Sequence, residues 1–132
     1  MKKIKYFKNL KEIKNNSIDI VYCDSVLQFA DDLSTMLNII KEFIRIAKRK
    51  IIILDIKNIK MKTKFIINKM KRLRLNRKEY EKMYSGVPYI FISKEFLKKK
   101  LNKYKNIKFK ISNAKNFQYL SKFSLNCIIE KL

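Results

Sequence analysis

Two nearly continuous apolar segments enclose an amphipathic stretch in the first half of the chain. Residues Ile18–Cys23 and Lys50–Ile56 predict two buried strands, and the nearly continuous apolar character of Ile18–Cys23 predicts burial on both faces. Between them, Met36, Ile40 and Phe43 recur at the spacing of one helix face. A strand, a helix and a second strand with short connections predict a right-handed βαβ unit whose two strands are parallel.

The second half of the chain changes its pattern twice. Residues Asn58–Met83 have helical spacing and many basic positions, whereas Ile107–Ile111 alternates as a half-exposed strand does. The expected apolar face of the helical stretch comprises Ile66, Met70 and Leu73. Residues Ser124–Glu130 form the last predicted strand, and the long loop before them has no room for a crossover helix, so the final two strands are predicted to be antiparallel. A further short strand is predicted at Ile4–Phe7.

The composition indicates one domain spanning residues 1–132 with a strong positive charge. Thirty-three basic residues against 11 acidic ones give a net charge of +22. This charge attracts phosphates, nucleic acid or anionic surfaces, and a basic binding module without catalysis is therefore one functional hypothesis. The alternative is a solvated coat, which the even spread of lysines along the chain favours.

The residue types that are missing exclude several kinds of chemistry. There is no histidine, so histidine-based catalysis and histidine metal sites are excluded, and no metal site is predicted. Cys23 and Cys127 both lie in apolar runs, which favours reduced thiols in a cytoplasmic protein over a disulfide framework. The longest aliphatic run, Ile51–Leu54, is too short to cross a membrane, and the basic start of the chain is followed by no apolar segment typical of a signal peptide.

Taken in this order, the elements resemble the C-terminal two-thirds of a class I S-adenosylmethionine-dependent methyltransferase. The segment Ser17–Phe29 is similar to the family's fourth strand and the loop after it, and Lys50–Ile56 is similar to the fifth strand, which ends at the acidic Asp55. The matching positions in the first segment are Asp19, Val21, Cys23, Asp24, Val26 and Leu27. A narrower resemblance, to methyltransferases associated with surface-polysaccharide gene clusters, is carried by Tyr80, Tyr84–Tyr89, Ser93–Glu95 and Phe123–Asn126.

The resemblance implies an α/β fold with a partial Rossmann-like sheet, parallel strands and a C-terminal antiparallel hairpin. The family's N-terminal Gly-rich βα unit has no counterpart, because the only glycine in the chain is Gly86. We therefore expect an N-terminally truncated methyltransferase that is weak or inactive alone and binds little S-adenosylmethionine. The strand Ile18–Cys23 would expose an edge, which another chain, self-association or the Ile4–Phe7 segment would cover.

The resemblance also assigns candidate residues to the cofactor. Asn9 matches a position whose side chain accepts from the adenine amino group, and Leu10 would offer its backbone N–H to the same ring. Cys23 and Asp24 would face the methionine part with their backbone, and Asp24 is the candidate for taking a proton from the methyl acceptor. The alternatives are a plain loop asparagine, ordinary packing for Leu10, and a turn cap for Asp24.

Four further residues are candidates for binding the methyl acceptor, which would be a carbohydrate or another small molecule. Gln28 follows the first strand, and Asp55 ends the second strand at the same edge of the sheet, so the carboxylates of Asp24 and Asp55 are expected to share one cleft. Tyr84 and Tyr89 flank the loop with Gly86 and can stack on a sugar or an apolar group. For each of these residues, core packing or a surface cap is the competing interpretation.

Overall fold

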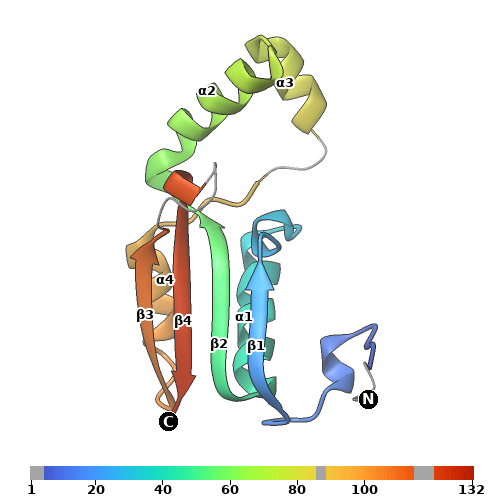
Figure 1. Cartoon of the computed structure of the whole chain (residues 1–132), viewed down its shortest axis with the longest axis vertical. Coiled ribbons are helices and arrows are strands. Elements are labelled where there is room, and N and C mark those ends of the chain that lie inside the picture. The colour runs from blue at the N-terminus through green and yellow to red at the C-terminus, as the bar shows by residue number, and fades with distance from the viewer. Residues whose placement is uncertain (1–4, 86–88, 115–120) are drawn as a thin grey trace.

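In a computed structural model that describes residues 5–85, 89–114 and 121–132, a four-stranded mixed sheet forms the centre of the protein. The strands are β1 (Ile18–Asp24), β2 (Ala47–Lys57), β3 (Ile107–Asn113) and β4 (Ser124–Lys131), in the spatial order β1-β2-β4-β3 (Figure 1). β1 and β2 are parallel, whereas β4 is antiparallel to both of its neighbours. The predicted parallel pair and the antiparallel ending are therefore confirmed.

Helix α1 (Leu33–Ile46) connects the two parallel strands. The carboxylate of Asp32 accepts a hydrogen bond from the Thr35 backbone N–H at 2.7 Å and caps the helix. Met36 and Ile40 are buried against the sheet, and the chain turns directly from Ile46 into β2. A βαβ unit of this length places the carboxyl ends of β1 and β2 side by side.

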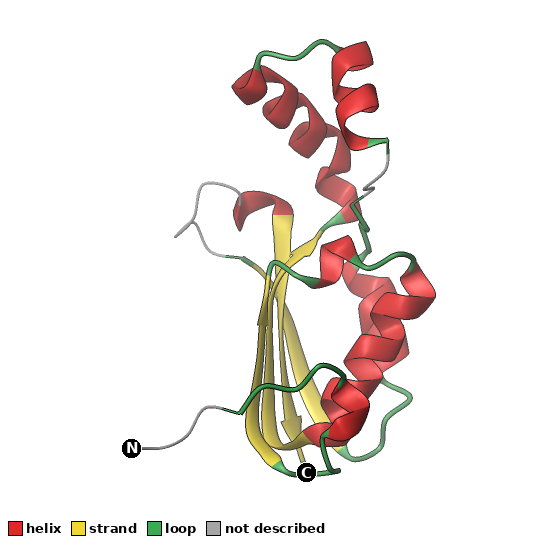
Figure 2. Cartoon of the chain, turned by 90° about the vertical axis from the view of Figure 1, so that its right-hand side faces the viewer, coloured by secondary structure: helices red, strands yellow, loops and turns green. Residues whose placement is uncertain are grey.

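The sheet is covered by helices on one face only (Figure 2). α1 and α4 (Lys94–Leu101) lie on this face, where Val21, Ile51 and Ile129 are among the buried core residues. The expectation that the strands are buried on both faces is wrong for β1, because Ile20 and Tyr22 point to the other side and are 53% and 60% exposed. We call this uncovered side the open face.

The basic stretch predicted as one helix forms two helices instead. α2 (Lys62–Leu73) ends where Arg74 adopts a left-handed conformation, and α3 (Arg77–Tyr84) begins with a capping box made by Asn76 and Glu79. Together they form a helical hairpin that projects beyond the carboxyl end of β2 (Figure 1). Ile66, Met70 and Leu73 share one face of α2, as predicted, but this is not its most buried face. Phe65 and Lys69 are the buried residues of α2, and Leu73 is 39% exposed.

The segment before β1 contains a short 3-10 helix, η1 (Leu10–Glu12), and no strand among its described residues. Ile4, at the start of the strand predicted at Ile4–Phe7, lies outside the described part of the chain, while Tyr6 and Phe7 are exposed and unpaired with the sheet. Gly86, within the predicted Tyr84–Tyr89 loop, also lies outside it. Within the described ranges, no helix is long and apolar enough to span a membrane.

Candidate functional site

Two carboxylates meet at the carboxyl ends of the parallel strands. Asp24 is the last residue of β1, and Asp55 lies near the end of β2. The hydroxyl oxygen of Ser25 lies between them, 2.9 Å from Asp24 Oδ1 and 2.8 Å from Asp55 Oδ2. Because a hydroxyl has a single proton, Ser25 can donate to one carboxylate at a time, and the arrangement holds both acidic groups at one edge of the sheet.

The backbone leaves its regular strand geometry at both positions that hold this pair. Ser25 has φ 58° and Asp55 has φ 59°, a left-handed conformation that costs a residue with a Cβ atom about 1 kcal/mol. Asp55 lies in a register irregularity between Ile53 and Ile56, where β2 passes β4, and its N–H donates to Asn126 Oδ1 at 3.3 Å. This local bulge re-aims the Asp55 side chain toward Ser25, as bulges beside functional sites often do.

A buried lysine holds one carboxylate of the pair in its charged form. Lys57 Nζ lies 2.7 Å from Asp55 Oδ1, and its side chain is only 2% exposed. The Ser124 hydroxyl donates to the same oxygen. Burial alone would raise the pKa of Asp55, but the hydrogen bonds from Lys57, Ser124 and Ser25 outweigh it and lower the pKa below its usual value.

Asp24 is the more accessible member of the pair. It has no lysine or arginine in ion-pair distance among the described residues, and its other oxygen, Oδ2, accepts from the Tyr22 hydroxyl at 3.3 Å. Partial desolvation of the Tyr22 hydroxyl, followed by the charge of Asp24 and the hydrogen bond to it, raises the pKa of Tyr22. With Lys57 neutralising Asp55, the site keeps one formal negative charge on a carboxylate that can accept a proton from a bound hydroxyl or ammonium group.

Beside the acidic pair lies an aromatic cluster, made by Phe65, Tyr84, Tyr89, Phe91 and Phe123, with Lys69 inside it. Lys69 Nζ lies 4.5 Å from the centre of the Tyr84 ring and 4.4 Å from that of Tyr89, and it donates to the Tyr89 hydroxyl. Burial lowers the pKa of Lys69, but its hydrogen bonds to the two tyrosines outweigh this effect and raise it. Lys57 Nζ, 5.0 Å from the Phe65 ring, connects the cluster to Asp55.

Gln28 is positioned between the strand ends and this cluster by the 3-10 helix η2 (Leu27–Phe29). Its backbone carbonyl accepts from Ile90 N–H at 2.9 Å, and the Phe29 ring lies 5.2 Å from Tyr89. The Gln28 side chain is 5% exposed, and its Oε1 has no hydrogen-bond partner among the described residues. A buried amide oxygen without a partner is costly and marks a place where a ligand donor or a water molecule would be stabilised.

Cys23 contributes to this edge only through its backbone. Its side chain is 6% exposed and faces the core beneath α1, in contact with the hydrophobic cluster of the domain. Burial, with a smaller contribution from the charge of Asp24, raises the pKa of the Cys23 thiol. The thiol is therefore held in its protonated, unreactive form.

Asn9 and Leu10 lie beside the amino end of β1, at the end of the sheet opposite to the two carboxylates. Asn9 is exposed and caps η1 by accepting from Lys11 N–H at 3.0 Å, and the Leu10 carbonyl accepts from Arg45 at the C-terminal end of α1 at 2.9 Å. The seven residues of β1 separate this segment from Asp24 by about 20 Å at roughly 3.3 Å per residue (Figure 1). The structure therefore does not bring these two residues together with Asp24, because Arg45 holds their segment beside the amino end of β1, and their expected adenine-binding role stays a prediction.

Comparisons with known proteins show what fold the chain has. No protein-family model matches the sequence, and no curated protein does. A solved structure from Thermotoga maritima, described as a SAM-dependent methyltransferase and possible histamine N-methyltransferase, matches 90% of this chain with a TM-score of 0.50 and 19% sequence identity. The chain spans 58% of the length of that structure. The protein thus shares the α/β fold of the matched part of that structure.

The structure brings some of the predicted site residues together and others not, and the roles predicted for them stay predictions. Asp24, Asp55, Gln28, Tyr84 and Tyr89 all lie at the carboxyl edge. Reasoning from sequence missed Ser25, Ser124 and the two lysines that become buried, Lys57 and Lys69. No group of three or more acidic or thiol side chains in the described ranges is arranged to hold a metal ion.

The residues at this edge fit only one side of an S-adenosylmethionine site. The turn after β1 and the Asp24 carboxylate are placed to face a ligand at the carboxyl edge. Where a Gly-rich turn would approach the nucleoside, the described chain has no further strand, because β1 pairs with β2 alone. The described residues therefore do not form a complete cofactor site, and no chemical step through the cofactor is assigned to them.

Proposed function

We propose that this protein is a S-adenosylmethionine-dependent methyltransferase-like domain that supplies the acceptor side of the active site. The observation that carries the proposal is the Ser25-bridged pair of Asp24 and Asp55, at the carboxyl ends of two parallel strands. This edge is where open α/β sheets bind their ligands. The partial methyltransferase fold gives the edge its chemical context.

Each polar group at the edge has a distinct role in this proposal. Asp24 takes a proton from the acceptor as the methyl group is transferred, while Asp55 is held ionised by Lys57 and orients Ser25. Tyr89 and the unpartnered oxygen of Gln28 contact the body of the acceptor. The single negative charge left at the site favours a neutral or cationic small molecule, such as a carbohydrate or an amine, over an anionic one.

The proposal requires a second polypeptide segment to complete the cofactor site. The edge of β1 that no described strand covers is the natural place for it, because its backbone N–H and C=O groups can pair with an added strand. According to this proposal, the chain has weak or no methyltransferase activity when it is alone. Either another protein or a second copy of the chain can cover the edge.

Calorimetric titration of the purified chain with S-adenosylmethionine and S-adenosylhomocysteine tests the incomplete cofactor site. We expect no measurable heat of binding for either compound. Binding in the low-micromolar range would show that the chain holds the cofactor by itself and would refute the need for a second segment.

An NMR titration tests the acceptor side separately. A panel of simple sugars and primary amines is added to isotopically labelled protein, and amide shifts are mapped onto the structure. We expect shifts confined to Asp24–Phe29, Asp55 and Tyr89, and their loss in the Asp24→Asn variant. Shifts confined to the open face, or shifts that Asp24→Asn leaves unchanged, would remove the acidic pair from the proposal.

A further inference from the structure

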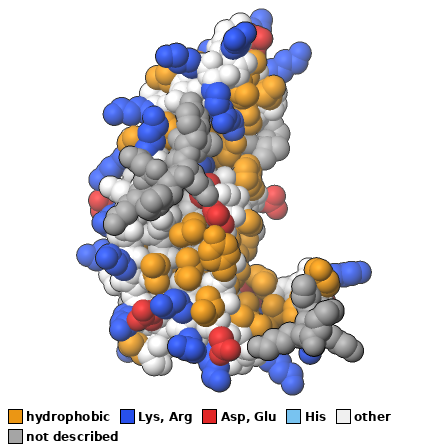
Figure 3. Space-filling view, in the orientation of Figure 1, with side chains coloured by type: hydrophobic (Ala, Val, Ile, Leu, Met, Phe, Trp, Pro, Cys, Tyr) orange, Lys and Arg blue, Asp and Glu red, His pale blue; other side chains and the backbone are white. Residues whose placement is uncertain are grey.

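The open face of the sheet carries an apolar strip across β1, β2 and β4, which ends at a lysine on β3. The strand registers place Tyr22, Ile52, Ile128 and Lys110 in one row, since Tyr22 pairs with Ile52, Ile52 with Ile128, and Ile128 with Lys110. Tyr22 is 60% exposed and Ile128 is 40% exposed. In the space-filling view, hydrophobic side chains gather at the middle of this face, with basic side chains around them (Figure 3).

The neighbouring row, about 7 Å away at two residues along each strand, is charged. It contains Ile20, Lys50, Glu130 and Lys108 in strand order. Glu130 is bridged by Lys50 at 3.7 Å and Lys108 at 3.0 Å, so one carboxylate serves two cations.

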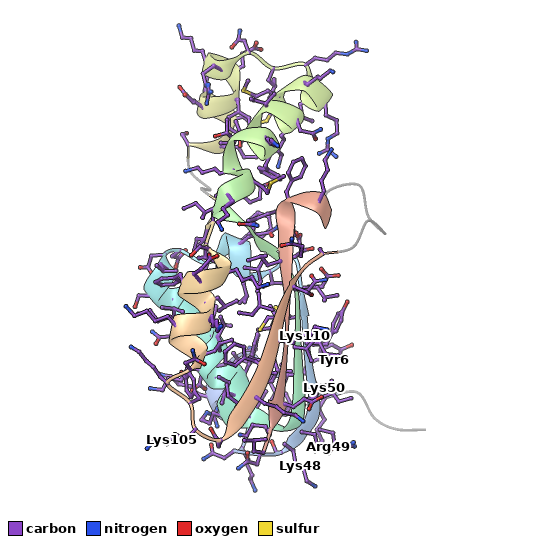
Figure 4. All side chains as sticks on the ribbon, turned by 90° about the vertical axis from the view of Figure 1, so that its left-hand side faces the viewer. Tyr6, Lys48, Arg49, Lys50, Lys105 and Lys110 are labelled. Atoms are coloured by element: carbon purple, nitrogen blue, oxygen red, sulfur yellow. The ribbon has the colours of Figure 1, made fainter. Side chains whose placement is uncertain are left out.

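Three more cations border the strip without any carboxylate partner among the described residues. They are Lys48, Arg49 and Lys110. Figure 4 shows these three and Lys50 on the open side of the sheet, together with the 90% exposed Tyr6, whereas Lys105 lies toward the helical side. The open face therefore combines an accessible aromatic ring with an excess of positive charge.

Two shallow hollows follow the charged row. One, of about 350 Å³, is lined by Ile20 and the basic run of β2, and the other, of about 300 Å³, lies over β3 and β4. Both are lined by Lys50 and Glu130, so they adjoin across the sheet. Five cations line them against one carboxylate, Glu130: Lys48, Arg49, Lys50, Lys108 and Lys110. Lys131 also lines the first hollow, but its ammonium group donates to the Ile44 carbonyl and to Asn16 Oδ1.

We propose that this open face binds single-stranded nucleic acid, in addition to the small molecule proposed for the carboxyl ends of the strands; the two surfaces meet where the Tyr22 hydroxyl donates to Asp24. The cations along the hollows would contact successive phosphates, and the Tyr22 ring with the aliphatic row beside it would receive the bases. A single strand exposes its base faces to such a surface, whereas a duplex keeps them stacked inside. A second copy of the chain is disfavoured as the occupant, because it would bring two molecules of charge +22 face to face.

Fluorescence anisotropy with a labelled oligouridine of roughly 20 nucleotides and a DNA duplex of similar length tests the proposal. We expect the single strand to bind more tightly than the duplex by about fivefold or more. If about five phosphates are contacted, each adds roughly 0.7 to the salt slope, so the affinity falls about 100-fold between about 50 and about 200 mM salt. Absence of binding at the lower salt concentration would overturn the proposal.

Matched variants separate this face from the overall charge of the chain. The triple variant Lys48→Gln/Arg49→Gln/Lys50→Gln removes three charges from the open face, and Lys98→Gln/Lys99→Gln/Lys103→Gln removes three exposed charges on and after α4. We expect about tenfold weaker binding and a salt slope smaller by about 2 for the first variant, and less than about twofold weakening for the second. Equal losses in both variants would show binding by bulk charge and would refute a site on this face.

Further measurements test the contact of Tyr22 with the bases and the alternative occupants of the open face. Tyr22→Ala is expected to weaken oligouridine binding about fivefold while leaving the salt slope and duplex binding unchanged; no effect on the oligouridine would remove the stacking contact. Tighter binding to vesicles with phosphatidylserine than to oligouridine, or a dimer in light scattering that Tyr22→Ala dissociates, would assign the face to lipid or to a second copy and overturn the proposal. Circular dichroism of each variant verifies that it is folded.

Discussion

Replacing Lys57 by methionine tests how the acidic site is held together. Lys57 is 2% exposed, and its ammonium group lies 2.7 Å from Asp55, whose side chain is 20% exposed. Removing one partner of a buried ion pair typically costs about 3–5 kcal/mol, because the other charge is left buried without compensation. Asp55 keeps its hydrogen bonds from Ser25 and Ser124, so we expect a loss at the lower end, about 3 kcal/mol.

The loss is measured as the change in free energy of unfolding by urea, followed by circular dichroism at about pH 7. The double variant Lys57→Met/Asp55→Asn is the control, because it removes both charges. We expect it to be more stable than Lys57→Met by about 1–2 kcal/mol, since no carboxylate is then left unpaired. A cost below about 1 kcal/mol for Lys57→Met would refute the reasoning that this pair stabilises the site.

The pH dependence of stability provides a second test of Lys57→Met. As pH falls, the native chain and this variant are expected to change in stability in opposite directions. The pKa of Asp55 is lowered from 3.8, so its contribution to stability is present above the unfolded pKa and is lost as pH falls through the depressed folded pKa. Without Lys57, burial is the largest remaining influence on Asp55 and raises its pKa. Lys57→Met is therefore expected to gain stability, relative to the native chain, as pH falls from about 7 to about 4. Parallel pH profiles for the two proteins would contradict this explanation.

Three further predictions concern the core, a helix cap and the buried thiols. Met36→Ala, at a fully buried position, is expected to cost about 3 kcal/mol in urea unfolding, whereas Ile67→Ala, at a 52% exposed position, should change stability by less than about 0.5 kcal/mol. Asn76→Ala removes the capping box with Glu79 and is expected to cost about 1 kcal/mol in the same assay. Burial raises the pKa of Cys127 to about 12, so a disulfide reagent at about pH 8 should modify it only after unfolding.

The apolar runs of the chain predict the parallel pair well but not the faces of its strands. Ile20 and Tyr22 belong to the same run as the buried Val21, and only the packing of helices on one side separates them. A continuous apolar run cannot distinguish a strand covered on both faces from an edge strand with an uncovered face, because both contain β-branched and aromatic residues.

The two buried lysines explain why the rest of the site could not be predicted from the sequence. Lysines are expected on a solvated surface, and neither the place of Lys57 at the end of a strand nor that of Lys69 on a helix signals that the side chain turns inward. Their burial depends on local geometry and tertiary packing that the sequence pattern does not show: the bulge at Asp55 and the Phe65 ring for Lys57, and the rings of Tyr84 and Tyr89 for Lys69. Asn9 shows the converse case. Its resemblance to a family position did not indicate where it lies, because Arg45 holds its segment beside the amino end of β1.

The net charge of +22 affects how readily the edge of β1 that no described strand covers can pair with another chain. Edge strands are commonly protected by lysines, but β1 has none, and its charged residues are the exposed Asp19 and the partly exposed Asp24. Repulsion between molecules of charge +22 therefore has to oppose edge-to-edge pairing of two copies. Salt weakens this repulsion, because the Debye length is about 8 Å at physiological ionic strength. The same repulsion does not act on an acidic polypeptide. A segment that completes the sheet beside β1 is thus expected to carry negative charge, which would let it pair with this edge in competition with a second copy.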